Sequence, residues 1–188
     1  MIQIKKYGDF INENLTNSQL KEFSEGGYDI KYKKVLDELS PENSYDIYWG
    51  RNKESNHYLT SNFTGKHAKL IGGVGSSVQD IWLHASGYPG SHVLIKAIKD
   101  YIIPTHILKI GAEIAKKNSK AKDVDNADIV WCYKNYVSVN PTDDIQSKIK
   151  ELESKEELSK EESDFIESNK PSVGRAFIDA KNRNIIRI

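Results

Sequence analysis

The run DIWLHASGYPGSHVLIK at residues 80–96 predicts two short strands joined by a tight loop, and so requires a β-sheet near the middle of the chain. In the first strand, Ile81 and Leu83 share one face, while Trp82 and His84 share the other. Glycine and proline in the loop provide the dihedral angles that a tight turn needs. We expect the loop to gather backbone N–H groups, serine hydroxyls and two imidazoles. Such donors suit a phosphate or a sugar better than an apolar ligand.

The rest of the sequence predicts strands and helices around this strand pair. Strand-like runs lie at 45–49, 129–133, 136–139, 173–178 and 184–188, and helical patterns at 9–24, 31–39, 53–63 and 104–118. Hairpin turns are expected at 134–135 and 181–182. A chain of 188 residues is long enough for one well-packed domain and short for two. The predicted fold class is therefore α/β (α+β), a single domain with a mixed or antiparallel sheet, helices packed on it and a charged helical insertion.

We place the charged insertion at 141–170, inside a domain spanning 45–188 that follows an N-terminal helical extension, 1–44. The insertion holds ten acidic and five basic side chains. Its apolar residues recur at helical spacings but too irregularly for a coiled coil, and they are Ile145, Ile149, Leu152, Leu158, Phe165 and Ile166. Because the whole chain has 27 basic and 27 acidic residues, the remainder is net positive. A local basic patch can bind phosphates without a basic isoelectric point.

Composition excludes several classes of protein. A single cysteine rules out an internal disulfide and is typical of a reducing compartment. No apolar run approaches the ~20 residues needed to span a membrane, and the N-terminus lacks the apolar core of a secretory signal. We therefore expect a soluble, cytoplasmic protein.

Arg51 follows a strand and a glycine, a position from which its guanidinium can reach a phosphate. Asn52 and Asn56 lie four residues apart, on one face of a helix that begins at Lys53. The alternative is structural, with Asn52 as a helix N-cap and Arg51 in a surface ion pair.

The two histidines of the 80–96 segment could in principle hold a metal, but no third ligand follows at a matching spacing. Ser91 and His92 are neighbours on a strand and point to opposite faces, so they do not form a hydrolase pair. We therefore expect no metal, no cofactor and no catalysis. The imidazoles instead hydrogen-bond the loop backbone, or donate to phosphate or 2′-OH groups. An RNA enzyme with His84 or His92 as general acid or base stays a weaker alternative.

Four motifs in order resemble the NFACT-R domain, the RNA-binding domain of ribosome-rescue factors of the fibronectin-binding protein A type. The first is Gly50-Arg51-Asn52 with Asn56, and the second is Asp80, Trp82 and His84 followed by PGSH at 89–92. The third is GAEIA at 111–115 followed by Ser119 and Lys120, and the fourth comprises VWCY at 130–133 and PSVGRA at 171–176. The resemblance implies a domain that binds RNA without catalysing a reaction.

On this basis we expect a non-catalytic module that binds structured RNA, either tRNA or ribosomal RNA, mainly through phosphates. DNA stays an alternative partner, because phosphate contacts carry little sequence information. The expected RNA-binding residues are Arg51, Asn52, Asn56, His84, Gly87, Tyr88, Gly90, Ser91, His92, Lys96, Lys116, Lys117, Ser119 and Lys120.

Two further hypotheses concern other segments. The acidic insertion could be the working surface of a protein-interaction module, with four apolar anchors for a partner or a second copy of the chain: Leu152, Leu158, Phe165 and Ile166. Residues 4–13 resemble the N-terminal peptides that direct internal proteins into phage heads, which would place the protein inside a virion and predicts cleavage after Glu13.

Overall fold

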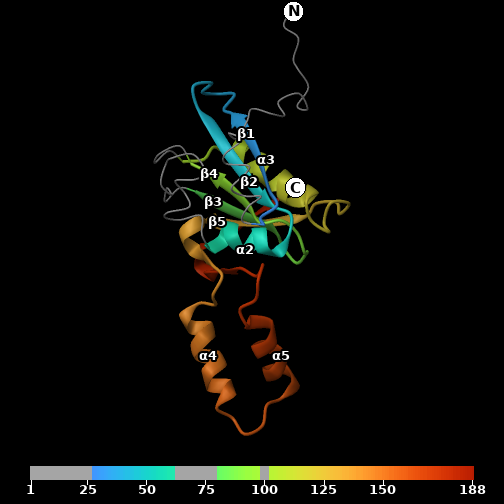
Figure 1. Ribbon diagram of the computed structural model, residues 1–188, viewed down its shortest axis with the longest axis vertical. Coiled ribbons are helices and arrows are strands. Elements are labelled where there is room, and N and C mark those ends of the chain that lie inside the picture. The colour runs from blue at the N-terminus through green and yellow to red at the C-terminus, as the bar shows by residue number, and fades with distance from the viewer. Residues whose placement is uncertain (1–26, 62–79, 98–101) are drawn as a thin grey trace, which may run out of the picture.

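The structure, a computed structural model, describes residues 27–61, 80–97 and 102–188 (Figure 1). Its main body is a six-stranded sheet with the strand order β1-β2-β4-β3-β5-β8, in which all neighbours pair antiparallel. The strands are β1 (Ile30–Leu36), β2 (Ser44–Gly50), β3 (Ile81–Ala85), β4 (Val93–Lys96), β5 (Asp128–Tyr133) and β8 (Asn184–Arg187), and the helices packed on them are α2 (Lys53–Ser61) and α3 (Thr105–Lys117). This architecture confirms the predicted fold class. In the described ranges, no helix has the length and apolar character needed to cross a membrane.

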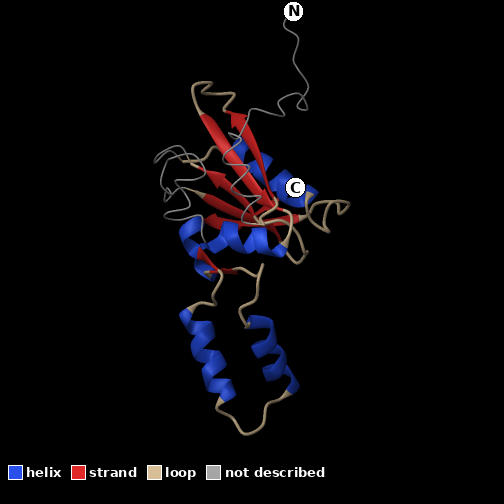
Figure 2. Cartoon of the chain, viewed as in Figure 1, coloured by secondary structure: helices blue, strands red, loops and turns tan. Residues whose placement is uncertain are grey.

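Helices cover both faces of the sheet (Figure 2). α3 packs on the face that carries Leu83 and Ile95, and α2 packs on the face that carries Trp82, with Leu59 buried between them. Gly111 lets α3 approach closely, since a Cβ there would lie 2.6 Å from Cδ1 of Ile95. The alternation predicted for 81–85 thus decides which side chains reach which layer.

The strand pair predicted within 80–96 is confirmed as β3 and β4, which place Trp82 opposite Leu94. A buried ion pair closes the open end of this pair, where Lys96 Nζ lies 2.9 Å from Asp80 Oδ2. The other carboxylate oxygen of Asp80 accepts a hydrogen bond from the backbone N–H of Ala97, at 2.8 Å. The 86–92 loop connects β3 to β4 at the other end of the strand pair, away from this ion pair.

The helix predicted at 31–39 is wrong, because this segment is mostly strand β1. β1 pairs with β2 along its whole length, from Ile30 opposite Gly50 to Leu36 opposite Ser44. Long-range pairing therefore overrides the local pattern. The division into 1–44 and 45–188 stays a prediction, with its border beside the turn between these strands. The helix predicted at 9–24 and the 4–13 peptide lie outside the described residues.

The two predicted hairpins join strands that do not pair with each other. Strand β6 (Val137–Ser138) pairs with β7 (Phe177–Ile178) in a small second sheet, whereas β5 and β8 pair with each other in the main one. The expected hairpins at 134–135 and 181–182 are therefore wrong, and short 3-10 helices occupy both places.

The charged insertion is helical, as predicted, and forms two helices between the paired strands β6 and β7. Helices α4 (Asp143–Glu153) and α5 (Lys160–Asn169) extend away from the main sheet (Figure 1). Leu152 and Ile166 are buried, whereas Leu158 is 37% exposed. Ser159 begins α5 with a reciprocal capping box to Glu162. Two of the four apolar anchors expected to meet a partner, Leu152 and Ile166, are thus already buried within the chain.

Candidate functional site

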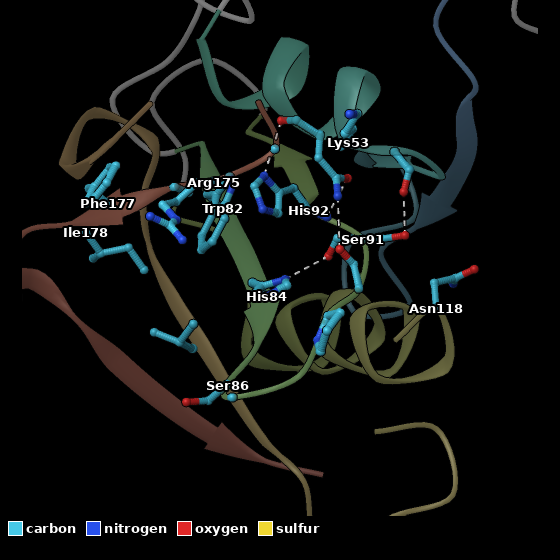
Figure 3. Close-up of a pocket in the computed structure, with 18 of the residues that line it drawn as sticks. Lys53, Trp82, His84, Ser86, Ser91, His92, Asn118, Arg175, Phe177 and Ile178 are labelled. Atoms are coloured by element: carbon cyan, nitrogen blue, oxygen red, sulfur yellow. Dashed lines mark hydrogen bonds between the residues drawn. The ribbon is translucent and has the colours of Figure 1, made fainter. Parts of the chain in front are cut away.

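A cavity of about 870 Å³ opens beside β3 on the α2 face of the sheet (Figure 3). Three segments surround it, namely 50–56 at the start of α2, the 86–92 loop, and 172–183 after α5. Trp82, His84 and His92 line it from the sheet side. Segments distant in sequence therefore build one site around the strand pair that the sequence singled out.

The 86–92 loop is fixed by the end of α3. Gly87 has φ +75°, a conformation that favours glycine. Gly90 lies against Ser119 so closely that a Cβ at Gly90 would be 2.3 Å from the Ser119 Cβ. The backbone N–H of Ser91 donates to Asn118 O, at 3.0 Å, and that of Lys120 donates to Pro89 O, at 2.9 Å. Ser119 thus supports the loop from behind and does not line the cavity.

The expectation that this loop offers its backbone N–H groups to a ligand is wrong at several positions. The N–H of Tyr88 donates to Ala85 O and that of Ser91 to Asn118 O, while the N–H of His92 donates to the Oδ1 of Asn56. These donors hold the loop together. The Ser91 hydroxyl is used in the same way, since it donates to Gly50 O.

Asn56 links α2 to the loop. Its Nδ2 donates to Gly90 O at 3.0 Å, and its Oδ1 accepts from the His92 N–H at 2.9 Å. Asn52 Oδ1 accepts from the N–H of Ser55 at 2.7 Å, which confirms the interpretation of Asn52 as an N-cap. Both asparagines line the cavity while their side chains serve the scaffold.

Trp82, His84 and His92 form an aromatic cluster. The ring centroids of Trp82 and His92 lie 4.9 Å apart and those of the two histidines 5.1 Å apart, both pairs edge-on. His92 is 3% exposed, and its Nδ1 lies 2.7 Å from the hydroxyl of Thr60. Burial, followed by the neighbouring His84, lowers the His92 pKa to about 3. Burial also lowers the pKa of His84. Both imidazoles are therefore neutral at pH 7.

The described charged side chains that line the cavity are all positive. Among the described residues that line it there are five cationic side chains and no Asp or Glu, and the cations are Arg51, Lys53, Lys120, Arg175 and Arg183. Because like charges collect here without carboxylate partners in the lining, the cavity suits a polyanion. A cavity with this charge balance is a natural place for phosphate groups.

The arginines are held in different ways. Arg51 Nε lies 3.7 Å from Asp29, and the Arg51 side chain stays 55% exposed, so the alternative of a surface ion pair is also realised. Nη1 of Arg175 donates to the backbone oxygens of Glu167 and Lys170, at 3.2 and 2.8 Å, and so contacts the end of α5. Nη2 of Arg183 donates to the Ser86 hydroxyl, at 3.1 Å. All three arginines line the cavity.

Gly174 brings the 172–183 segment against α2. It has φ +84°, and a Cβ at this position would lie 2.8 Å from the Lys53 Cβ. Lys53 and the neighbouring Arg175 both line the cavity. The 172–183 segment follows α5 in the chain, so it links the insertion to the wall of the cavity.

Nine of the fourteen expected RNA-binding residues line the cavity, and they are Arg51, Asn52, Asn56, His84, Gly87, Gly90, Ser91, His92 and Lys120. The other five do not. Lys96 pairs with Asp80, Lys116 Nζ donates to Ile188 O at 3.1 Å, and Ser119 supports the loop. Tyr88 and Lys117 are exposed.

Sequence reasoning missed several lining residues: Lys53, Asn118, Arg175 and Arg183. Arg175 stands in the PSVGRA run, and the adjacent glycine was a signal that the backbone there makes a close approach. Arg183 had no comparable local signal. Within the described part of the chain, no group of three His, Cys, Asp or Glu residues could hold a metal ion.

Fold and cavity together define a small antiparallel α/β domain with a cation-lined pocket. Comparison with protein-family models and with curated proteins finds no match. Among solved structures, the C-terminal part of the fibronectin/fibrinogen-binding protein from Streptococcus suis is similar, with 18% identity and a TM-score of 0.48. The match covers 82% of this chain and 44% of that one, so this chain spans less than half of its neighbour.

Proposed function

We propose that the protein is a non-catalytic RNA-binding module of the NFACT-R type, which binds structured RNA, such as tRNA or ribosomal RNA, mainly through phosphates. The observation that carries the proposal is the one-sided charge of the cavity, with five cations and no acidic side chain among its described lining residues. The four motifs in order support the family assignment, and the second of them builds one side of this cavity.

A non-catalytic role agrees with the chemistry of Ser91, which lines the cavity, and of the single cysteine, which does not. The Ser91 hydroxyl is engaged with Gly50 O. Cys132, the single cysteine, is buried, and burial raises the pKa of its thiol to about 12. Neither side chain is activated as a nucleophile.

The test is a fluorescence-anisotropy titration with labelled tRNA and with a DNA duplex, at low and at physiological salt. We expect salt-sensitive binding that prefers RNA, and we expect Arg51→Ala to lose about 1–3 kcal/mol of binding free energy. Lys117→Ala is the matched control, because Lys117 is exposed but does not line the cavity. Absence of binding at low salt would overturn the proposal.

A second candidate function is protein binding through the insertion. It is favoured by the way α4 and α5 stand away from the sheet (Figure 1) and by the ten acidic side chains of the 141–170 insertion, which a basic partner surface would complement. A pull-down with the intact protein and with a version lacking 143–168 tests it. Loss of a bound partner on deletion supports this function, and equal recovery from both versions contradicts it.

A further inference from the structure

The hydrogen bonds of His84 identify which ring nitrogen carries its proton. Nδ1 lies 3.3 Å from the backbone oxygen of Ser91. A carbonyl oxygen can only accept, so the proton is on Nδ1. Because the ring is neutral, Nε2 then carries a lone pair. The second nitrogen of His84 is therefore a hydrogen-bond acceptor.

This acceptor is open to the cavity. Buried polar side-chain atoms without a hydrogen-bond partner occur in the described residues at Ser55 Oγ, His57 Nδ1 and His106 Nε2. His84 Nε2 is not among them, and the bond to Ser91 O is the one hydrogen bond found for His84 in the described residues. The atom consequently touches solvent, and His84 lines the cavity between the Ser91 loop and the 172–183 segment (Figure 3).

His92 has the same tautomer. Its Nδ1 lies 3.2 Å from Asn56 O as well as 2.7 Å from the Thr60 hydroxyl. The Thr60 hydroxyl itself donates to Asn56 O and accepts from Trp82 Nε1. The proton of His92 is thus also on Nδ1, and neither histidine supplies positive charge. The expectation that these imidazoles donate to phosphate does not fit this arrangement.

A cavity with cations around it and a neutral acceptor within it calls for a ligand that carries anions and a donor close together. In RNA, the 2′-OH lies on the carbon next to the one that bears the 3′-phosphate, so donor and anion are never far apart. DNA has the same phosphates without this donor. A base N–H is a donor too, but it lies farther from the phosphate that the cations would hold.

We infer that Nε2 of His84 accepts a hydrogen bond from a ribose 2′-OH and so selects RNA over DNA at this cavity. The inference rests on the proposed function, since it needs RNA phosphates among the cations. His84 is the reachable member of the pair, because His92 is 3% exposed. His84 thus discriminates RNA from DNA, whereas the cationic side chains supply most of the binding free energy.

The experiment compares a short labelled RNA hairpin with the same sequence carrying 2′-fluoro groups. The 2′-fluoro analogue keeps the phosphates and the A-form shape but has no hydroxyl donor. Binding is measured with the wild-type protein and with two variants. His84→Asn retains a donor near the Nδ1 position and loses the acceptor, whereas His84→Gln retains an acceptor near the Nε2 position. Thermal unfolding confirms that both variants are folded.

We expect wild type and His84→Gln to bind the RNA about three- to tenfold tighter than the 2′-fluoro analogue, as one hydrogen bond would give. His84→Asn should bind the two equally. If wild type binds both equally and tightly, the inference fails and RNA binding stands. If a preference exists but persists in His84→Asn, another residue reads the hydroxyl and the inference also fails. If neither hairpin binds at low salt, the proposed function itself is wrong.

Discussion

The salt dependence of RNA binding can be worked out from the cavity. If each of its five cationic side chains meets one phosphate, five counterions are released. The slope of log K against log salt is then about −4.5 on a duplex and about −3.5 on a single strand. Between 50 and 200 mM salt the affinity should fall roughly 100- to 500-fold. These slopes are upper limits, because Arg51 already lies 3.7 Å from Asp29.

Single substitutions separate the cavity from the general basic character of the chain. Lys120→Gln should reduce the slope by about 0.7–0.9, because Lys120 lines the cavity. Lys117→Gln is matched to it in charge and in exposure, lies three residues away, and should leave the slope unchanged. Anisotropy titrations at four or more salt concentrations measure both. Equal effects of the two substitutions, or a wild-type slope near zero, would refute the assignment of phosphate binding to this cavity.

Three further predictions concern stability and the insertion. The pKa of His92 falls from 6.5 to about 3 on folding, so the unfolded chain binds a proton in this window that the folded chain does not. The contribution of neutral His92 to the free energy of unfolding is fully present above about pH 6.5, and the free energy of unfolding should be about 2 kcal/mol lower at pH 5. Urea unfolding at the two pH values measures this difference. His92→Gln should remove most of it. Gly90→Ala forces a Cβ to 2.3 Å from that of Ser119 and should cost about 1–3 kcal/mol in thermal unfolding; an unchanged melting temperature would contradict the packing. Replacing 143–168 by a short Gly-Ser linker removes ten acidic and four basic side chains, and RNA affinity should survive or rise; its loss would make the insertion part of the RNA interface.

The strand pair and its loop could be predicted because their signals are local. Alternation over 81–85 decides which side chains face each layer, and the glycines and proline that follow permit a tight turn. The insertion was recognisable for a similar reason, since its charge and its apolar spacing both change abruptly at Pro141. Local patterns of this kind need no knowledge of distant partners.

Strand β1 shows where such reasoning fails. Its residues Lys31, Lys33 and Lys34 do not alternate with apolar residues in a regular way, and lysine by itself favours a helix over a strand. The segment becomes a strand because β2 offers it a partner along its full length. The choice of partner for β6 and for β8 is likewise a long-range property, and sequence proximity suggested the wrong neighbours for both.

The same distinction applies to the cations of the site. Lys96 and Lys116 belong to the net-positive part of the chain outside the insertion, yet Asp80 contacts the ammonium group of Lys96 and Ile188 O that of Lys116. Arg183 lies almost a hundred residues from the loop whose Ser86 it contacts. The sequence does not show which partner a charged side chain has in the fold. It therefore cannot show that a lysine is engaged in a structural contact, or that an arginine from a distant segment lines the cavity.

Affinity and selectivity should therefore come from different residues of one cavity. Phosphate contacts position a nucleic acid and carry no information on its sugar, so substitutions at Arg51, Lys120 or Arg183 should weaken RNA and DNA alike. A change at His84 should alter the ratio of the two affinities and leave the salt slope in place, because a neutral imidazole releases no counterion. If removal of the His84 acceptor changed the salt slope instead, the imidazole would be charged in the complex, and the separation of these two roles would be wrong.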